Sequence, residues 1–264
     1  MKFLKFISTN NEILTGICNG EKSIDIIDGN PLSEYRITGK KCRFDDIKEY
    51  LPPVEIPAII ALGGNYAEHA RECKESVPDR PLVFLKAFTS LTGHKSHVVL
   101  PKQAPNEVDY EAELGVIIKR KAKNITAEQA PEYILGYTCV NDVSARDCQL
   151  KLDKQWARGK SFDTFCPVGP VIETELDPEN TRIKLFLNGE CMQDDTTSHL
   201  IYSVYEIVSY LSQNMTLLPG TLLLTGTPAG VGLARNPQVF LKNGDTVIVQ
   251  IEGIGCLENT VTSE

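Results

Sequence analysis

Short apolar runs separated by polar turns make up most of the chain. Near the start, the runs KFLKFI (residues 2–7), ILTGIC (13–18) and SIDII (23–27) are divided by turn-forming polar residues. Runs at 59–62, 81–88, 112–118, 137–142, 221–226 and 246–251 have the same character. This pattern predicts a protein built mainly from β-strands.

Helical periodicity is rare by comparison. Residues 198–213 give the clearest case, because apolar residues recur there at steps of three and four: Leu200, Ile201, Val204, Ile207, Val208 and Leu211. Shorter helices are predicted over 66–75 and from the capping-box pattern Thr126–Gln129. Together the elements predict an α+β protein, mostly β, rather than an alternating βαβ chain.

A proline-rich stretch, LPPVEIP at residues 51–57, interrupts the strand pattern. Two consecutive prolines cannot continue a helix or a central strand. The interruption predicts a small N-terminal β domain over residues 1–54 and a larger domain over 55–264. The candidate chemical groups all fall in the larger one.

Composition and charge narrow the class of protein. The net charge of −8 argues against a nucleic-acid surface, and no run of about 18 apolar residues indicates a membrane span. The first residues show no signal-peptide pattern, so we expect a cytoplasmic protein. The eight cysteines are scattered without a C-x-x-C pair, which favours reduced thiols over disulfides or a structural zinc site.

Two acidic residues share one face of a predicted strand. Glu111 and Glu113 alternate at the start of the run 112–118, so their side chains project together. Their repulsion is relieved if both are solvated at an exposed edge, or if a cation such as Mg²⁺, Ca²⁺ or Mn²⁺ binds between them. Asp142 follows another strand in a loop, but its spacing does not pair it with the two glutamates.

Three further stretches carry candidate groups. His69 and Glu72 lie three residues apart, so on a helix the carboxylate could orient the imidazole, although a hydrated surface pair has the same spacing. Lys160 stands beside a glycine in WARGKSFD. The loop LTGTPAGVG (224–232) lacks the lysine and spacing of phosphate-binding motifs, so a tight turn is the expected interpretation.

Taken in order, these segments resemble the fumarylacetoacetate hydrolase superfamily. The resemblance runs from about Ile59 to the C-terminus through GGNYAEHARE, PLVFLKAF, VDYEAELGVII, NDVSARDCQ, RGKSFDTFCPVGP, LNGECMQDDTT, LLTGTPAGVG and FLKNGDTV. It implies a mixed β-roll core with few short helices, usually in a homodimer. It also implies that residues 1–54 correspond to the small N-terminal domain of many bacterial members.

The resemblance also assigns roles to the candidate groups. It joins Glu111, Glu113 and Asp142 into one Mg²⁺ or Mn²⁺ site and makes His69 and Glu72 a general-base pair. It places Lys160 at the substrate, where metal and ammonium together would act as the electron sink. It further implies contacts from three residues to the substrate's acid and carbonyl groups: Arg146, Gln149 and Thr227.

One departure from the family pattern narrows the range of expected substrates. The larger hydrolases have an additional aspartate ligand ahead of the histidine, and residues 60–65 contain no acid. This favours the smaller members: acylpyruvate hydrolases, oxaloacetate decarboxylases or tautomerases, and 2-hydroxyhepta-2,4-diene-1,7-dioate isomerases. Water could fill the vacant coordination position.

The expected function is metal-dependent hydrolysis or lysis of a C–C bond in a small 2-oxo acid, through an enolate stabilised by the metal. Isomerisation of a 2-hydroxydienoate and tautomerisation of oxaloacetate are alternatives, since they begin from the same enolate. A catalytically silent protein that binds metal and a dicarboxylate is a third, although no member of the chemical set is missing.

Overall fold

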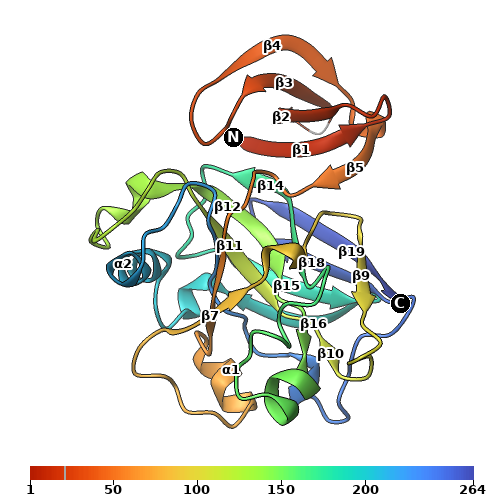
Figure 1. Ribbon diagram of the computed structural model, residues 1–264, viewed down its shortest axis with the longest axis vertical. Coiled ribbons are helices and arrows are strands. Elements are labelled where there is room, and N and C mark those ends of the chain that lie inside the picture. The colour runs from red at the N-terminus through yellow and green to blue at the C-terminus, as the bar shows by residue number, and fades with distance from the viewer. Residues whose placement is uncertain (21) are drawn as a thin grey trace.

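The computed structural model describes residues 1–20 and 22–264 and consists mainly of β-strands with few short helices (Figure 1). Its elements in chain order are β1 (Lys2–Ser8), β2 (Ile13–Asn19), β3 (Ser23–Gly29), β4 (Tyr35–Cys42), β5 (Ile47–Leu51), β6 (Ile59–Gly63), α1 (Ala67–Glu72), β7 (Leu82–Lys86), β8 (Leu91–Thr92), β9 (His97–Leu100), β10 (Val108–Asp109), β11 (Ala112–Ile118), β12 (Ile134–Asn141), β13 (Ser144–Ala145), a π-helix (Asp147–Leu152), β14 (Cys166–Glu173), β15 (Arg182–Leu187), β16 (Glu190–Thr196), α2 (Val204–Asn214), β17 (Leu222–Leu224), β18 (Thr246–Ile251) and β19 (Gly255–Ser263). The predicted α+β class, mostly β, is confirmed.

Two large sheets form the body of the molecule. The first has twelve strands, with the path β4-β3-β2-β1-β14-β12-β11-β17-β6-β7 and with β5 and β8 attached to β1 and β14. The second has five strands in the order β16-β15-β18-β19-β9, and a short ribbon pairs β10 with β13. The sheets are mixed, because β17 runs parallel to β6 while β11 runs antiparallel to β12.

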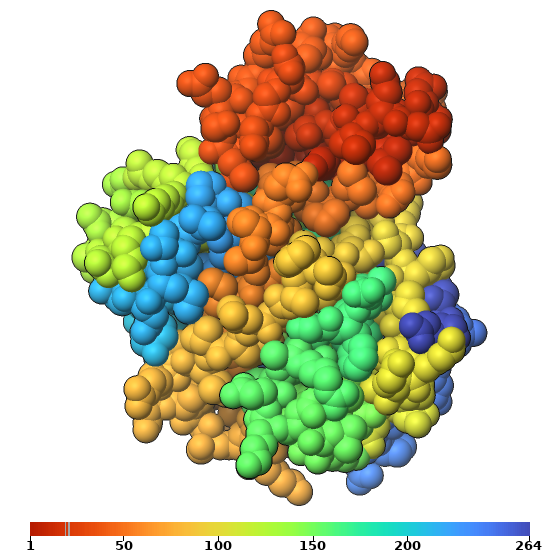
Figure 2. All heavy atoms as spheres, viewed as in Figure 1, coloured from red at the N-terminus to blue at the C-terminus, as the bar shows by residue number. Residues whose placement is uncertain are grey.

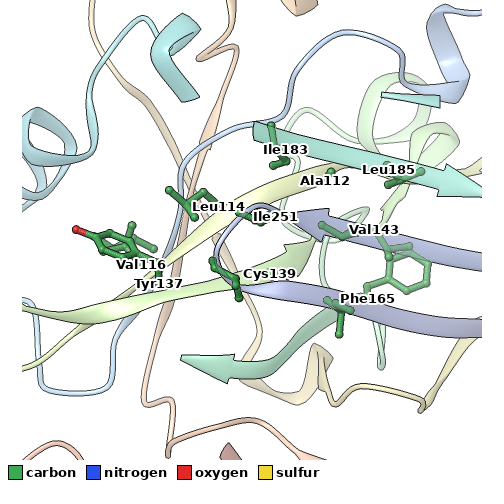
Figure 3. Packing of buried hydrophobic residues seen from close by; sticks show 14 of the residues in the cluster. Ala112, Leu114, Val116, Tyr137, Cys139, Val143, Phe165, Ile183, Leu185 and Ile251 are labelled. Atoms are coloured by element: carbon green, nitrogen blue, oxygen red, sulfur yellow. The ribbon is translucent and has the colours of Figure 1, made fainter. Parts of the chain in front are cut away.

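The main hydrophobic core fills the space between these sheets. Strand β11 lies at its centre, and its even-numbered residues Ala112, Leu114, Val116 and Ile118 all belong to the larger buried cluster. Figure 3 shows side chains of β11 facing residues of β15 and β18 across this space. Ile117 points the other way, into a second cluster. Both faces of β11 are therefore buried, which explains its almost unbroken run of apolar residues.

The N-terminal strands β1–β5 lie together at one end of the molecule (Figure 1), and β1 joins them to the rest of the twelve-stranded sheet. Strand β1 joins β14 through two residue pairs, Lys2 with Glu173 and Phe3 with Ile172. Val54 is buried in the same cluster as Phe3, so the proline-rich stretch packs against both parts. The domain border between residues 54 and 55 stays a prediction.

Helix α2 is shorter than its periodicity predicted. The helix begins after Ser203, whose hydroxyl accepts a hydrogen bond from the Glu206 N–H, while the Glu206 carboxylate accepts one from the Ser203 N–H. This capping box fixes the start, so the predicted start at residue 198 is wrong. Leu200 and Ile201 precede the helix: Leu200 packs against the main hydrophobic cluster, and the Ile201 N–H bonds to the Asn65 carbonyl.

The short helix predicted from Thr126 is also displaced. Gln129 does bond back to the Thr126 N–H, but the element that forms is a 3-10 turn at Ala130–Tyr133. Pro131 has no N–H to offer Ala127, so an α-helix cannot continue through it.

Two further expectations concern cysteines and membranes. In the described part of the chain, which includes all eight cysteines, none is paired in a disulfide. No helix among the described residues is long and apolar enough to cross a membrane.

Candidate active site

The pairing of β11 with β12 creates the candidate site. These strands run antiparallel with Ala112 opposite Asn141, so the start of one meets the end of the other. The Asp142 N–H bonds to the Glu111 carbonyl at 2.9 Å, and the Asn141 side chain accepts the Glu111 N–H at 3.0 Å. Strand register therefore brings Asp142 beside Glu111, although the two residues are far apart in sequence.

Three carboxylates converge at this point. Glu111, Glu113 and Asp142 each offer an oxygen, and these oxygens all lie within 4.8 Å of one another. All three side chains are buried, with at most 5% of each residue exposed. The interpretation of Glu111 and Glu113 as charges at an exposed edge is excluded. The juxtaposition of Asp142, implied by the family resemblance, is present.

Buried cations surround the carboxylates. The Lys160 ammonium lies 2.7 Å from Glu111 Oε2 and 2.6 Å from Asp142 Oδ2. Lys86 donates to Asp142 Oδ1 at 2.5 Å from the other side. Arg146 Nη2 lies 2.8 Å from Glu111 Oε1. Each cation is desolvated, so its attraction to the acids is screened little by water.

The balance of these charges leaves one carboxylate without a counter-ion. Burial raises the pKa of Glu113 well above its usual range, and the like charges of Asp142 and Glu111 raise it further. Burial also raises the pKa of Glu111, but the charges of Lys160 and Arg146 outweigh burial and hold it below its usual range. A divalent cation would supply the missing charge, and an oxygen-only donor set suits Mg²⁺ or Mn²⁺. The residues present therefore fit a metal site.

The histidine and the carboxylate that are expected to act together as a general base lie on helix α1. His69 Nδ1 is 2.8 Å from Glu72 Oε1, and Glu72 Oε2 accepts the Gly230 N–H at 2.8 Å. Burial lowers the pKa of His69, but hydrogen bonds with Cys73 and Glu72 and the charge of Glu111 raise it to about 10. The side chains are only 12% and 20% exposed, which excludes a hydrated surface pair.

The glycine-rich loop after β17 ties the two groups together. The Gly226 N–H donates to Glu113 Oε2 at 2.6 Å, and the Gly230 N–H donates to Glu72. Both glycines have positive φ, and a Cβ at Gly230 would lie 2.1 Å from the Met192 carbonyl oxygen. The loop therefore binds carboxylates of the protein itself through its backbone.

Two of the three carboxylates and His69 line one cavity of about 70 Å³. His69, Glu111, Glu113 and Lys160 line it, together with the three residues expected to contact substrate: Arg146, Gln149 and Thr227. Of the predicted site residues only Glu72 and Asp142 do not line the cavity: Glu72 is hydrogen-bonded to His69, and Asp142 accepts from Lys160. Their roles in catalysis stay predictions.

Sequence reasoning gave no role to several buried polar residues of the site. Lys86 contacts Asp142, and Asp109 accepts N–H groups from Gly232 and Leu233 while Arg146 donates to it at 2.9 Å. A lysine inside the apolar run FLKAF was the available signal for Lys86, since lysine is rarely buried without a partner.

The stretch that lacks a fourth acid has a structural role of its own. Asn65 falls in the stretch without an acid, and its side chain is fully engaged with backbone. It donates to the carbonyls of Tyr202 and Thr225 and accepts the Tyr202 N–H. Asn65 therefore fastens two loops behind the site.

A buried carboxylate cluster and a largely buried histidine that border one cavity, on a mostly β fold, are typical of an enzyme's active site. Comparison with known proteins specifies the class: residues 58–262 match the family model described as fumarylacetoacetate (FAA) hydrolase C-terminal. The chain belongs to the fumarylacetoacetate hydrolase family and is an enzyme.

Several relatives are named as tautomerases or isomerases. The mitochondrial oxaloacetate tautomerase Fahd2a of Rattus norvegicus is 43% identical over 80% of this chain and 69% of its own length. A solved 2-hydroxyhepta-2,4-diene-1,7-dioate isomerase from Mycobacterium marinum is 38% identical, with a TM-score of 0.88 over 100% of this chain and 99% of that one. A 5-carboxymethyl-2-hydroxymuconate delta-isomerase from Mycobacterium smegmatis is 37% identical, with a TM-score of 0.89 over 100% of both chains.

Proposed function

We propose that this enzyme moves a proton between carbon and oxygen, or between two carbons, of a small dicarboxylic 2-oxo acid, with Mg²⁺ or Mn²⁺ as cofactor. The observation that carries the proposal is that His69 and two of the three clustered carboxylates line one cavity. Relatives named as tautomerase and isomerases support the same reaction class. This places proton transfer ahead of the C–C cleavage expected from the sequence.

Charge supports an acidic substrate. Four acids, Asp109, Glu111, Glu113 and Asp142, are buried with three cations: Lys86, Arg146 and Lys160. With a divalent ion bound and every acid ionised, these groups carry one excess positive charge, and the Glu72 carboxylate offsets the charge of a protonated His69. A carboxylate of the substrate would neutralise the excess, and buried charges are tolerated when they are paired.

The chain's own residues would divide the work. Glu111, Glu113 and Asp142 would hold the metal, which when bound supplies a Lewis acid for the substrate's carboxylate and carbonyl oxygens. His69, oriented by Glu72, would take a proton from carbon and return it. Lys160 would place a positive charge near the developing oxyanion, while Arg146, Gln149 and Thr227 would contact the substrate's acid and carbonyl groups.

C–C cleavage of an acylpyruvate is the second candidate. The hydrogen bond between His69 and Glu72 favours it equally, because an oriented histidine can activate water as well as remove a carbon-bound proton. The two reactions differ in whether a water molecule is consumed and a bond is broken.

One assay separates these candidates. We would incubate the protein with Mg²⁺ or Mn²⁺ and with oxaloacetate, acetylpyruvate, fumarylpyruvate or 2-hydroxyhepta-2,4-dienedioate in D₂O. Loss of enol absorbance together with deuterium at carbon, and no new fragments by NMR, is the expected result. New fragments would establish cleavage, and no turnover of any compound would refute both. Chelation should abolish activity, and Mg²⁺ or Mn²⁺ should restore it.

We propose further that the enzyme is a homodimer. Leu82, Leu85 and Phe88 lie at or beside the edge strand β7 with 43%, 55% and 66% of each residue exposed. Leu150 and Leu152 are exposed on the neighbouring segment, and Figure 2 shows the two segments meeting on one face. Exposed large apolar side chains on adjoining segments favour self-association. Sedimentation should give twice the chain mass, and Leu85→Glu should give monomers.

A further inference from the structure

A second group of side chains that could ligate a metal lies on α1 and at its C-cap residue, Cys73. His69, Glu72 and Cys73 are spaced i, i+3 and i+4, and the Cys73 N–H still bonds to the His69 carbonyl, so all three share one face of the helix. His69 Nδ1 lies 2.8 Å from Glu72 Oε1 and 3.9 Å from Cys73 Sγ. One ligand atom from each residue lies within 4.8 Å of the others.

The donor atoms of this group differ in kind from those of the carboxylate cluster. The carboxylates offer oxygen alone, whereas α1 offers sulfur, nitrogen and oxygen. Hard oxygen donors suit Mg²⁺ or Mn²⁺, and thiolate with imidazole suits Zn²⁺. The two groups should therefore select different ions even though they border the same cavity.

The distances are close to those of a tetrahedral zinc site. With Zn–N and Zn–O near 2.0 Å and Zn–S near 2.3 Å, tetrahedral angles place nitrogen about 3.3 Å from oxygen and about 3.5 Å from sulfur. The observed 2.8 Å and 3.9 Å differ from these by about 0.5 Å. A small rotation of the Glu72 and Cys73 side chains would open the first distance and close the second.

The surroundings favour such a site. The Gly230 N–H holds Glu72 Oε2, which orients the carboxylate and leaves Oε1 directed at His69. His69 and Cys73 both line the cavity, so a fourth coordination position would open toward water or substrate. Glu72 and His69 are partly exposed, which gives an ion a route in.

From this geometry we infer that His69, Glu72 and Cys73 form a second metal site, selective for Zn²⁺, whose occupation switches the enzyme off. Binding would displace the Sγ proton and any proton on Nδ1 to solvent. The imidazole and the carboxylate would then be metal ligands, so His69 could not act as a general base oriented by Glu72. The inhibitory part of this inference rests on the proposed function, while the binding part does not.

Binding is tested optically with Co²⁺ as the probe. Full-length protein saturated with Mg²⁺ is titrated with Co²⁺, and the near-ultraviolet charge-transfer band of a cobalt thiolate is recorded. We expect the band to saturate at about one Co²⁺ per chain. Added Zn²⁺ should displace the Co²⁺ and abolish the band. Cys73→Ser should remove it, and His69→Ala should weaken Co²⁺ binding more than about tenfold, the effect already typical of losing an outer partner of a ligand.

Two matched controls locate the signal. Cys191→Ser removes an exposed thiol elsewhere and should leave the band unchanged. Glu111→Gln alters the carboxylate cluster, which contains no sulfur, and should also leave it unchanged. A band that persists in Cys73→Ser, or no band in the parent protein, would overturn the inference. Circular dichroism of each variant distinguishes loss of a ligand from loss of the fold.

Inhibition is tested separately. In saturating Mg²⁺, low Zn²⁺ should stop turnover by the parent enzyme and should be reversed by a zinc chelator. Cys73→Ser should need more than about tenfold more Zn²⁺ for the same inhibition. If the optical site is present but Zn²⁺ does not inhibit, the regulatory claim fails alone. If no substrate turns over at all, the proposed function fails and the optical result still stands.

Discussion

The two sides of the cavity are built differently. On one side, Glu111, Glu113 and Asp142 stand on or beside the central strands β11 and β12, fully buried and fixed by Lys86, Arg146 and Lys160. On the other side, His69 and Glu72 stand on a six-residue helix and are partly exposed. From this contrast we predict that changes on the carboxylate side act mainly on stability, whereas changes on the side of His69 and Glu72 act mainly on reactivity.

His69→Ala should give the largest change in rate. Loss of a general base typically reduces kcat by about 10²- to 10⁴-fold, and removal of the largely buried imidazole should lower the free energy of unfolding by about 1–2 kcal/mol, less than a loss within the carboxylate cluster. Steady-state kinetics and urea denaturation measure the two quantities. The control is His97→Ala, which alters an exposed histidine on β9. A decrease in kcat smaller than about tenfold would contradict the role of His69 as general base.

Lys86→Met should give the largest change in stability. The substitution leaves Asp142 Oδ1 without its buried cation, which should lower the free energy of unfolding by about 3–5 kcal/mol. Urea denaturation without metal measures this loss, and added Mg²⁺ should recover part of it. Lys151→Met is the matched control, because Lys151 is 61% exposed and its ion pair with Glu107 should contribute about 1 kcal/mol or less. An equal loss of unfolding free energy in both variants would show that the buried ion pair of Lys86 stabilises the protein no more than the exposed ion pair of Lys151 does.

Glu72→Gln should change the pH profile more than the fold. The Glu72 carboxylate helps to raise the pKa of His69 to about 10, so its neutral replacement should lower that pKa. A base works only when unprotonated, so activity rises with pH up to its pKa. The acid limb of the kcat/KM profile should therefore move to lower pH, while kcat falls less than in His69→Ala. An unchanged profile would show that Glu72 does not act through His69.

Thr227→Val should give the smallest effect. The Thr227 hydroxyl lines the cavity and accepts from Gln193 Nε2 at 2.7 Å, and that amide also donates to the Pro228 carbonyl. Removing one hydrogen bond to substrate should raise KM about fivefold, equivalent to about 1 kcal/mol, with kcat nearly unchanged. Thr227→Ser, which keeps the hydroxyl, should restore KM. A large fall in kcat instead would place Thr227 among the groups that act on the transition state.

On the carboxylate side of the cavity, the sequence predicted two of the three acids from local spacing but not the third. The alternation at Glu111 and Glu113 was readable because a strand has a fixed period of two. Asp142 was not assignable from spacing, because its position depends on the register between β11 and β12, which no local pattern encodes. An antiparallel pairing of these two predicted strands would have been the available signal, since it places the start of one beside the end of the other.

On the base side, the spacing of His69 and Glu72 was readable but their burial was not. Burial comes from Gly230 and the loop around it, more than 150 residues further along the chain. The helix at 198–213 shows the same limit: apolar periodicity extended to Leu200, and only the capping box at Ser203 marks the true start. Local patterns predicted the elements, while long-range contacts decided which polar groups are buried.

The glycine-rich loop has a consequence for redesign of this enzyme. Its backbone N–H groups fasten Glu113, Glu72 and Asp109, so an insertion or deletion there would disturb both sides of the cavity at once. Leu150 and Trp156 also line the cavity, yet neither side chain is bonded to the carboxylates. Libraries aimed at new substrates should therefore vary the rim formed by Leu150 and Trp156 and keep the loop at its present length.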